Sequence, residues 1–182
     1  MGAPVRPNGE SVVLRSARLD EFSAASDLIR AAYREYAARM PDRWQRYLDR
    51  AADVWSRADE GELLVAERDG SIVGSVTFYH PGPQAAAQGW PEGWAGIRLL
   101  AVPPAERGRG FGRAIMEATV ERARQIGAGA LALHTTEMMA IARAMYERMG
   151  FERVPEYDFH PSSGRTVMAY RFLLKSNAAA SG

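Results

Sequence analysis

The spacing of hydrophobic residues divides the chain into strands and helices. Short apolar runs, some with every second residue apolar, predict strands. Apolar residues at positions i, i+3 and i+4 predict amphipathic helices. On this basis we expect strands at residues 11–15, 63–67, 72–79, 97–102, 130–134, 151–154 and 166–174, and helices at 22–36, 42–58, 114–126 and 137–149.

Glycines and prolines mark the connections between these elements. Asp69-Gly70 lies between two predicted strands and is a strong signal for a tight hairpin. The strands at 97–102 and 130–134 are expected to be parallel, because a helix joins them. A long loop at 80–94 carries Trp90 and Trp94, which either pin it to the protein or stack on a substrate. We favour pinning.

Composition narrows the class of protein. The 182 residues have a formal net charge of +1 and include no cysteine. Near-zero net charge favours neither nucleic acid nor an anionic membrane as a partner, and the absence of cysteine excludes disulfides and thiolate metal sites. We expect one domain over residues 11–175, disordered termini at 1–10 and 176–182, and a cytoplasmic location. No run approaches the roughly 20 apolar residues of a membrane span, and no metal site is expected.

The most distinctive stretch is the turn Arg-Gly-Arg-Gly-Phe-Gly-Arg at 107–113. Pro103 and Pro104 end the strand before it, and a helix follows it. Glycines allow the backbone to bend tightly, and the unpaired N–H groups of the helix start carry partial positive charge. With three arginines around it, this turn is expected to bind an anion such as a diphosphate.

Two well-known phosphate motifs do not fit the turn. The dinucleotide pattern G-x-G-x-x-G would need glycine at Arg113 or Ile115, and the nucleotide P-loop pattern does not occur. The pattern R-x-x-G-x-G does fit, as Arg107, Gly110 and Gly112. It resembles the coenzyme A (CoA) pyrophosphate loop of the GNAT N-acetyltransferase superfamily.

Two flanking segments extend the resemblance over residues 12–174. Leu-Leu-Ala-Val-Pro precedes the turn, and Ala142-x-x-x-Tyr146-x-x-x-Gly150-Phe151 follows it. The resemblance implies an α/β fold, with a mixed, mostly antiparallel, twisted sheet of six to seven strands flanked by about four helices. It also implies that an acetyl group moves directly from acetyl-CoA to a primary amine of a small molecule or peptide. The helices over 22–36 and 42–58 would form the lid over that acceptor, unless Trp44 and Trp55 belong only to the core.

The resemblance also assigns roles to individual residues. Tyr146 would be the general acid that protonates the departing thiolate. The backbone N–H near Leu100 would bond the thioester oxygen. The residues implied in binding the cofactor are Leu100, Ala101, Val102, Arg107, Gly108, Arg109, Gly110, Phe111, Gly112, Arg113 and Ala142.

Two departures from the family pattern leave parts of the mechanism open. Many relatives carry a glutamate on the strand before the turn, but residues 95–98 read Ala-Gly-Ile-Arg. Glu92, His80, His134 or water could therefore serve as the base, and His134 is the better candidate of the two histidines. Relatives often have an asparagine that contacts the pantetheine arm, and Met139 stands there.

Other functions are compatible with the same residues. One is a non-catalytic module of this fold that binds acyl-CoA as a sensor or scaffold, and a weaker one is a nucleotide-binding enzyme. The sequence leaves open which amine is the acceptor and whether an acyl group other than acetyl is transferred. It also leaves the oligomeric state open, although the superfamily often forms homodimers.

Overall fold

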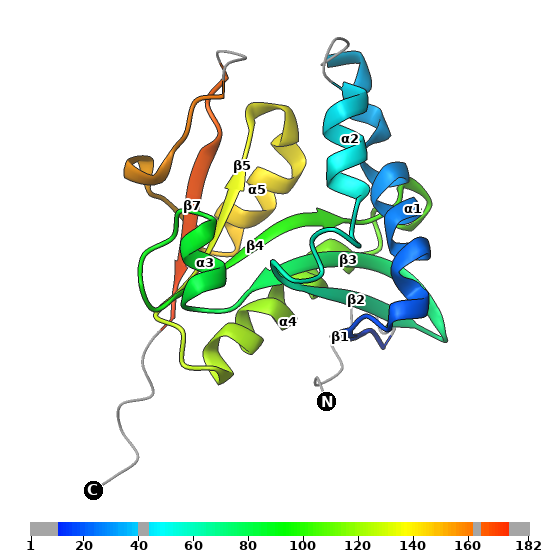
Figure 1. The fold of residues 1–182 in the computed structure, drawn as a ribbon, viewed down its shortest axis with the longest axis horizontal. Coiled ribbons are helices and arrows are strands. Elements are labelled where there is room, and N and C mark those ends of the chain that lie inside the picture. Colours follow the sequence, from blue (N-terminus) through cyan, green and yellow to red (C-terminus); the bar gives the residue numbers. More distant parts are fainter. Residues whose placement is uncertain (1–10, 40–43, 162–164, 175–182) are drawn as a thin grey trace, which may run out of the picture. The chain divides into compact units, whose positions relative to one another are not determined.

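The computed structural model describes residues 11–39, 44–161 and 165–174 (Figure 1). Its seven strands form one sheet in the order β1-β2-β3-β4-β5-β7-β6, with β4 and β5 parallel and antiparallel pairing at β1–β2, β2–β3, β5–β7 and β6–β7. The strands are β1 Val13–Ser16, β2 Glu62–Arg68, β3 Ser71–Tyr79, β4 Trp94–Ala101, β5 Ala130–Thr135, β6 Glu152–Arg153 and β7 Met168–Leu173. The predicted mixed, mostly antiparallel sheet is therefore confirmed.

The described residues include five α-helices, where the sequence predicted about four. They are α1 Phe22–Tyr33, α2 Trp44–Ala52, α3 Pro83–Ala87, α4 Phe111–Gln125 and α5 Ala140–Arg148. The additional helix, α3, is a single short turn inside the expected long loop. The predicted helix at 22–36 continues beyond Tyr33 as a 3-10 helix, and the one predicted at 42–58 ends at Ala52. Residues 41–43 lie outside the described residues.

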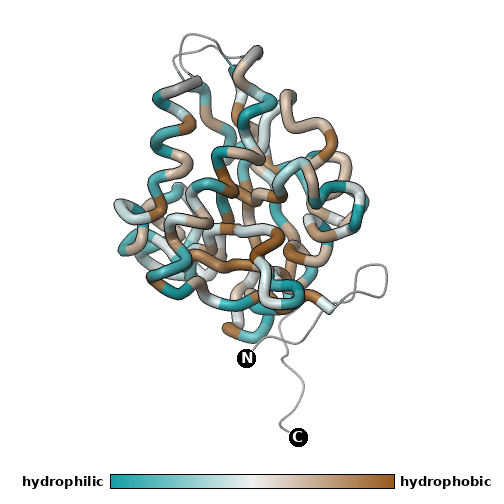
Figure 2. Tube along the Cα trace, turned by 90° about the vertical axis from the view of Figure 1, so that its right-hand side faces the viewer, coloured by the Kyte–Doolittle hydropathy of each residue, from teal (hydrophilic) through white to brown (hydrophobic). Residues whose placement is uncertain are grey.

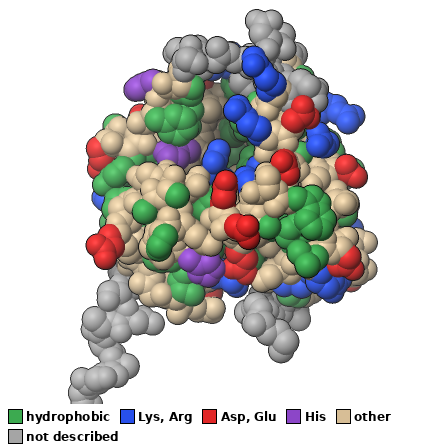
Figure 3. Space-filling view, viewed as in Figure 1, with side chains coloured by type: hydrophobic (Ala, Val, Ile, Leu, Met, Phe, Trp, Pro, Cys, Tyr) green, Lys and Arg blue, Asp and Glu red, His purple; other side chains and the backbone are tan. Residues whose placement is uncertain are grey.

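Contacts within the chain define two compact units. The first comprises the described residues up to Phe78 together with Leu99–Thr119, and the second comprises Tyr79–Arg98 with the described residues from Val120 onward. Along the chain, hydrophobic residues are interrupted at short intervals by hydrophilic ones, as expected for elements with one buried face (Figure 2). On the face in Figure 3, basic and acidic side chains are interspersed, in keeping with the low net charge.

The first unit is built on the hairpin of β2 and β3. Asp69 and Gly70 connect the two strands, and both have positive φ angles, 50° and 77°. This is the turn that the dipeptide predicted, because such turns need left-handed backbone at both central residues. α1 packs against α2, and buried Ile29 and Leu64 contribute to the core of this unit.

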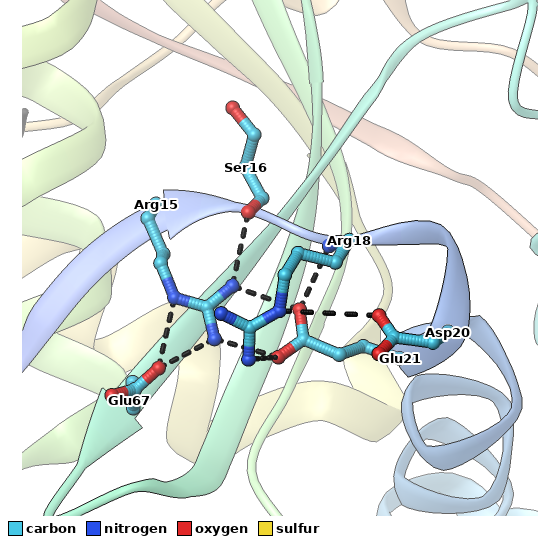
Figure 4. A network of polar contacts seen from close by, with 6 residues as sticks. All are labelled: Arg15, Ser16, Arg18, Asp20, Glu21 and Glu67. Carbon is cyan, nitrogen blue, oxygen red and sulfur yellow. Dashed lines mark hydrogen bonds and ion pairs between the residues drawn. The ribbon is translucent and has the colours of Figure 1, made fainter.

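A network of charged side chains ties β1 to β2 and to the start of α1 (Figure 4). The Arg15 guanidinium donates to Glu21 at 2.6 and 2.8 Å and to Glu67 at 2.9 Å. Glu21 also accepts the Arg18 backbone N–H at 2.7 Å. The bonds from Arg15, and then the one from the Arg18 N–H, outweigh burial and lower the pKa of Glu21 from 4.5 to about 2.

No described helix combines the length and the apolar character needed to cross a bilayer.

In the second unit, β5 pairs with β7 from Ala130–Leu173 to Thr135–Met168. Trp90 is buried there against Gly96, where an added Cβ would lie 2.7 Å from the indole ring. The pinning interpretation of Trp90 is confirmed, because the ring occupies the space that a side chain at position 96 would need.

We expect Glu21→Gln to lower the free energy of unfolding by about 1–2 kcal/mol, because Gln is neutral and has one acceptor oxygen where Glu21 offers two to Arg15. The lowered pKa means that unfolded chains take up protons as the pH falls through 4.5, before folded ones do. The stability difference between wild type and variant should therefore be full above pH 4.5 and shrink toward pH 2. Urea unfolding at several pH values measures it.

Asp20→Asn is the matched control. The Asp20 side chain is 82% exposed and lies 3.9 Å from Arg18, so its loss should change stability by less than about 0.5 kcal/mol. Equal effects of the two substitutions would contradict the importance given to the Arg15–Glu21 contact.

Candidate active site

The turn predicted to bind an anion lies in the first unit, at the start of α4. Gly108 and Gly110 have φ angles of 76° and 86°, which side chains other than glycine rarely adopt. An added Cβ at Gly108 would meet no atom within 4 Å, so nothing crowds this side of the turn. Phe111 begins the helix and is buried, which anchors it.

The first helical hydrogen bond of α4 runs from the Ala114 N–H to the Gly110 carbonyl at 3.0 Å. The N–H groups of residues 111–113 precede that bond and so have no partner within the helix. They carry the partial positive charge of the helix start. The backbone of this turn therefore has the donors that an anion requires, whatever the side chains do.

The three arginines of the turn differ in their surroundings. Arg107 donates to the Ala32 carbonyl at 2.7 Å, to Glu35 at 2.8 Å and to the Val102 carbonyl at 3.2 Å. These contacts hold the turn against the end of α1, where the last carbonyls of a helix lack internal partners. The role of Arg107 in binding a cofactor stays a prediction, and its role in joining these segments is directly visible.

Arg109 and Arg113 lie on the surface of the turn. Arg109 bonds Glu106 at 3.0 Å, with its guanidinium 5.2 Å from the centre of the Phe111 ring. Arg113 bonds Glu117 at 2.7 Å, and its side chain is 65% exposed. The Arg113–Glu117 pair is exposed and worth little in stability, so a phosphate could compete for the Arg113 guanidinium at low cost, whereas the Arg109–Glu106 bond is partly buried.

The end of β4 departs from regular strand geometry. β4 pairs with β5 from Trp94–Ala130 to Ile97–Leu133, and two residues later Leu99 has a φ of 57°. A left-handed leucine costs roughly 1–2 kcal/mol, so surrounding contacts must hold it. One is a hydrogen bond from the Tyr33 hydroxyl to the Leu100 carbonyl at 3.1 Å.

Tyr146 lies in the second unit, near the end of α5, and is buried. The Phe151 N–H donates to the Tyr146 carbonyl, and the Gly150 N–H donates to the Glu147 carbonyl, both at 3.0 Å. Gly150 has a φ of 94°, and the Tyr146 and Phe151 rings are 5.8 Å apart. This is a Schellman helix end with its usual hydrophobic contact. The motif thus has a structural explanation, while the acid role of Tyr146 and the cofactor role of Ala142 stay predictions.

His134 is the most enclosed of the candidate bases. Its ring stacks on Trp90 at 4.2 Å, Phe159 meets it edge-on at 5.0 Å, and its Nε2 lies 2.9 Å from the Tyr157 carbonyl. Because a carbonyl only accepts, Nε2 carries the proton in the neutral ring and Nδ1 keeps a lone pair. Burial is the main cause of a lowered His134 pKa, against which the bond to Tyr157 acts.

The other candidate bases, Glu92 and His80, are less enclosed than His134. Glu92 is exposed, and His80 is half-buried at the start of the segment that contains α3. Among the described residues no group of three or more His, Asp or Glu side chains is placed to hold a metal ion. Of the expected lid tryptophans, Trp55 is 55% exposed with its ring 4.9 Å from Phe22, and the Trp44 side chain lies outside the described residues.

Tyr33 is the residue that sequence reasoning missed. In the sequence, Tyr33 is one more apolar position of an amphipathic helix. No neighbouring residue indicates that its hydroxyl contacts Leu100. The two residues are 67 positions apart, so only the fold brings them together.

In sequence, the chain is similar to known acetyltransferases. Residues 29–151 match the model of the acetyltransferase (GNAT) family. Mycothiol acetyltransferases of Cellulomonas flavigena and Sanguibacter keddieii are 34% identical over 105 residues and 32% over 156, covering 57% and 83% of this chain. The chain spans only 30% and 47% of their lengths.

A solved structure extends the likeness to the fold. A GNAT family acetyltransferase from Brucella melitensis, in complex with acetyl-CoA, superposes with a TM-score of 0.58 at 20% identity. The match covers 94% of this chain and 93% of that one.

We expect the lowered pKa of His134 to appear in the pH dependence of stability. As the pH falls through 6.5, unfolded chains bind a proton at this histidine before folded ones do, so wild type should lose stability. Arg98 lowers this pKa and Asp158 raises it. His134→Gln should remove that part of the pH slope, measured by urea unfolding between pH 7.5 and 5. Identical slopes in the two proteins would show that His134 titrates normally.

Proposed function

Because the chain belongs to the acetyltransferase (GNAT) family, we propose that it transfers an acetyl group from acetyl-CoA directly to a primary amine of a small molecule or peptide. The observation that carries the proposal is the turn before α4. It joins left-handed Gly108 and Gly110 to the unpaired N–H groups of a helix start. This arrangement suits a pyrophosphate, because the helix start offers several backbone donors and a Cβ added at Gly108 would meet no atom within 4 Å.

Binding would be shared between the turn and β4. The N–H groups of residues 111–113 would bond the pyrophosphate, and Arg109 and Arg113 could add charge-assisted bonds to phosphate oxygens. The backbone of residues 100–102 would bind the pantetheine arm. The Leu100 N–H would then bond the thioester oxygen, where negative charge develops as the amine attacks.

The leaving group needs a proton once the carbon–sulfur bond breaks. Tyr146 would donate it, since a phenol with an ordinary pKa of about 10 is protonated at neutral pH. The attacking amine loses a proton in the same reaction. A lysine-like amine costs roughly 4.6 kcal/mol to neutralise at pH 7, at 1.36 per pH unit.

His134 is the favoured acceptor of the amine's proton, directly or through water. Its Nε2 bond to Tyr157 leaves Nδ1 as the basic atom, and its lowered pKa keeps the ring neutral at pH 7. Glu92, His80 and bulk water stay alternatives. The names of the relatives concern mycothiol, but this chain spans less than half of each, so the acceptor is left to experiment.

A sensor or scaffold that binds acyl-CoA without catalysis is the second candidate. Two observations favour it: residues 95–98 include no carboxylate, and Met139 replaces the usual asparagine. Titration calorimetry with acetyl-CoA and an assay of thiol release with a panel of amines separate the two functions. Binding with release on some amine supports the enzyme, and tight binding with no release on any amine supports the sensor. Competition by ATP or NAD but not by CoA would refute both.

We expect Gly110→Ala to raise the dissociation constant of acetyl-CoA more than about tenfold, because a Cβ disfavours the left-handed backbone that aims the turn's N–H groups. Gly70→Ala is the matched control: Gly70 has a similar φ of 77° and lies in the β2–β3 hairpin. Both variants should lose similar stability, but only Gly110→Ala should lose affinity in calorimetry. Unchanged affinity would make the assignment of the turn wrong.

We expect Tyr146→Phe to lower kcat about 100-fold or more while the affinity for acetyl-CoA stays within a few-fold, because only the proton donor is removed. Tyr170→Phe is the control, since the Tyr170 hydroxyl donates to Glu147 at 2.8 Å and has no proposed chemical role. Steady-state thiol release measures both variants. Equal activity of the two would remove Tyr146 from the mechanism.

A further inference from the structure

Two side chains hold the carbonyls at the end of β4. The Tyr33 hydroxyl donates to the Leu100 carbonyl at 3.1 Å, and the Arg107 Nε donates to the Val102 carbonyl at 3.2 Å. In extended backbone, residues two apart direct their carbonyls to the same side. The carbonyl between them, that of Ala101, faces β3, where it would lie 3.0 Å from a Cβ at Gly74. Tyr33 and Arg107 therefore hold the edge of β4 that faces away from β3.

Both side chains are fixed by the end of α1. Tyr33 is the last residue of that helix, and Arg107 bonds the carbonyl of Ala32 next to it. The Tyr33 ring is buried and lies 5.9 Å from the Tyr36 ring and 6.4 Å from the Tyr47 ring. The hydroxyl is thus presented to Leu100 by a well-packed support.

The bond to Tyr33 comes directly after the irregular residue of the strand. Leu99, with its φ of 57°, sets the plane of the peptide that carries the Leu100 N–H. In a strand the N–H and C=O of one residue point to the same side, so fixing the Leu100 carbonyl also fixes the direction of its N–H. The Tyr33 hydroxyl thus holds the carbonyl of Leu100, and the left-handed Leu99 orients the peptide that carries its N–H.

We propose that Tyr33 is a positioning residue for acyl transfer, which holds the Leu100 carbonyl and thereby aims the Leu100 N–H at the thioester oxygen. The proposal rests on the proposed function, in which that N–H polarises the thioester. It adds a side chain from α1 that no motif of the family resemblance contains. Tyr33 itself touches neither cofactor nor acceptor in this role.

The test uses the infrared carbonyl stretch of acetyl-CoA carrying a ¹³C-labelled thioester carbonyl. A hydrogen bond to the thioester oxygen lowers the frequency of this stretch, so the wild-type complex should absorb below free acetyl-CoA. Tyr33→Phe keeps the ring and removes only the hydroxyl, so its complex should absorb closer to the free molecule. Tyr170→Phe, which loses a hydroxyl bonded to Glu147, should keep the wild-type frequency.

Kinetics provide a second readout for the same variants. With any amine that supports thiol release, Tyr33→Phe should lower kcat about three- to tenfold, as expected for one neutral hydrogen bond. The KM for acetyl-CoA should stay within about twofold, since the turn at 107–113 is intact. A purely structural role would instead lower thermal stability and leave the carbonyl frequency unchanged.

The outcomes separate this proposal from the proposed function. Wild type that binds no acetyl-CoA overturns both. Wild type that binds it without a lowered stretch, or a Tyr33→Phe complex with the wild-type stretch, overturns the positioning role and leaves cofactor binding in place. Should Tyr33→Phe not fold, Tyr33→Leu also lacks the donor and is expected to give the same shift toward free acetyl-CoA.

Discussion

The Tyr33 hydroxyl and the Leu100 carbonyl form one hydrogen bond on which the geometry of the candidate site depends. Together with Arg107 it joins three segments of the first unit: the end of α1, the end of β4 and the turn before α4. Arg68 of β2 adds a bond to Glu106 at 3.2 Å, which supports the turn from another strand. Binding sites need such support, because donors that are free to move lose part of their effect on a developing charge.

Leu99, one of the two described non-glycine residues with positive φ, lies in the same region. Leu99, Gly108 and Gly110 all have positive φ within twelve consecutive residues of the chain, and only the two glycines adopt it without steric cost. Strained residues persist where surrounding contacts over-determine them, and they are often found at functional sites. The leucine is more informative than the glycines, because a tight turn alone would not require it.

The second unit shows that one motif can have two explanations. The Tyr146-to-Phe151 segment forms a helix end that glycine and two aromatic rings stabilise without any chemistry. His134 is likewise held by Trp90, Phe159 and Tyr157, whose contacts could serve packing alone. Burial lowers the pKa of the His134 imidazole under either explanation, so only an effect on acetyl transfer would distinguish a catalytic role from packing.

The sequence by itself determined the features that depend on neighbouring residues. Apolar runs predicted the strands, Asp69-Gly70 predicted the hairpin, and the glycine turn with its flanking segments predicted the family. Only the tertiary structure decided features that arise between distant segments. Leucine disfavours a left-handed backbone, so position 99 gives no local signal, and Tyr33 and Arg107 find their partners across 67 and 75 positions. An arginine beside a glycine turn is expected to face a phosphate, yet here the carbonyl of Ala32, at the end of α1, is close enough to accept its hydrogen bond.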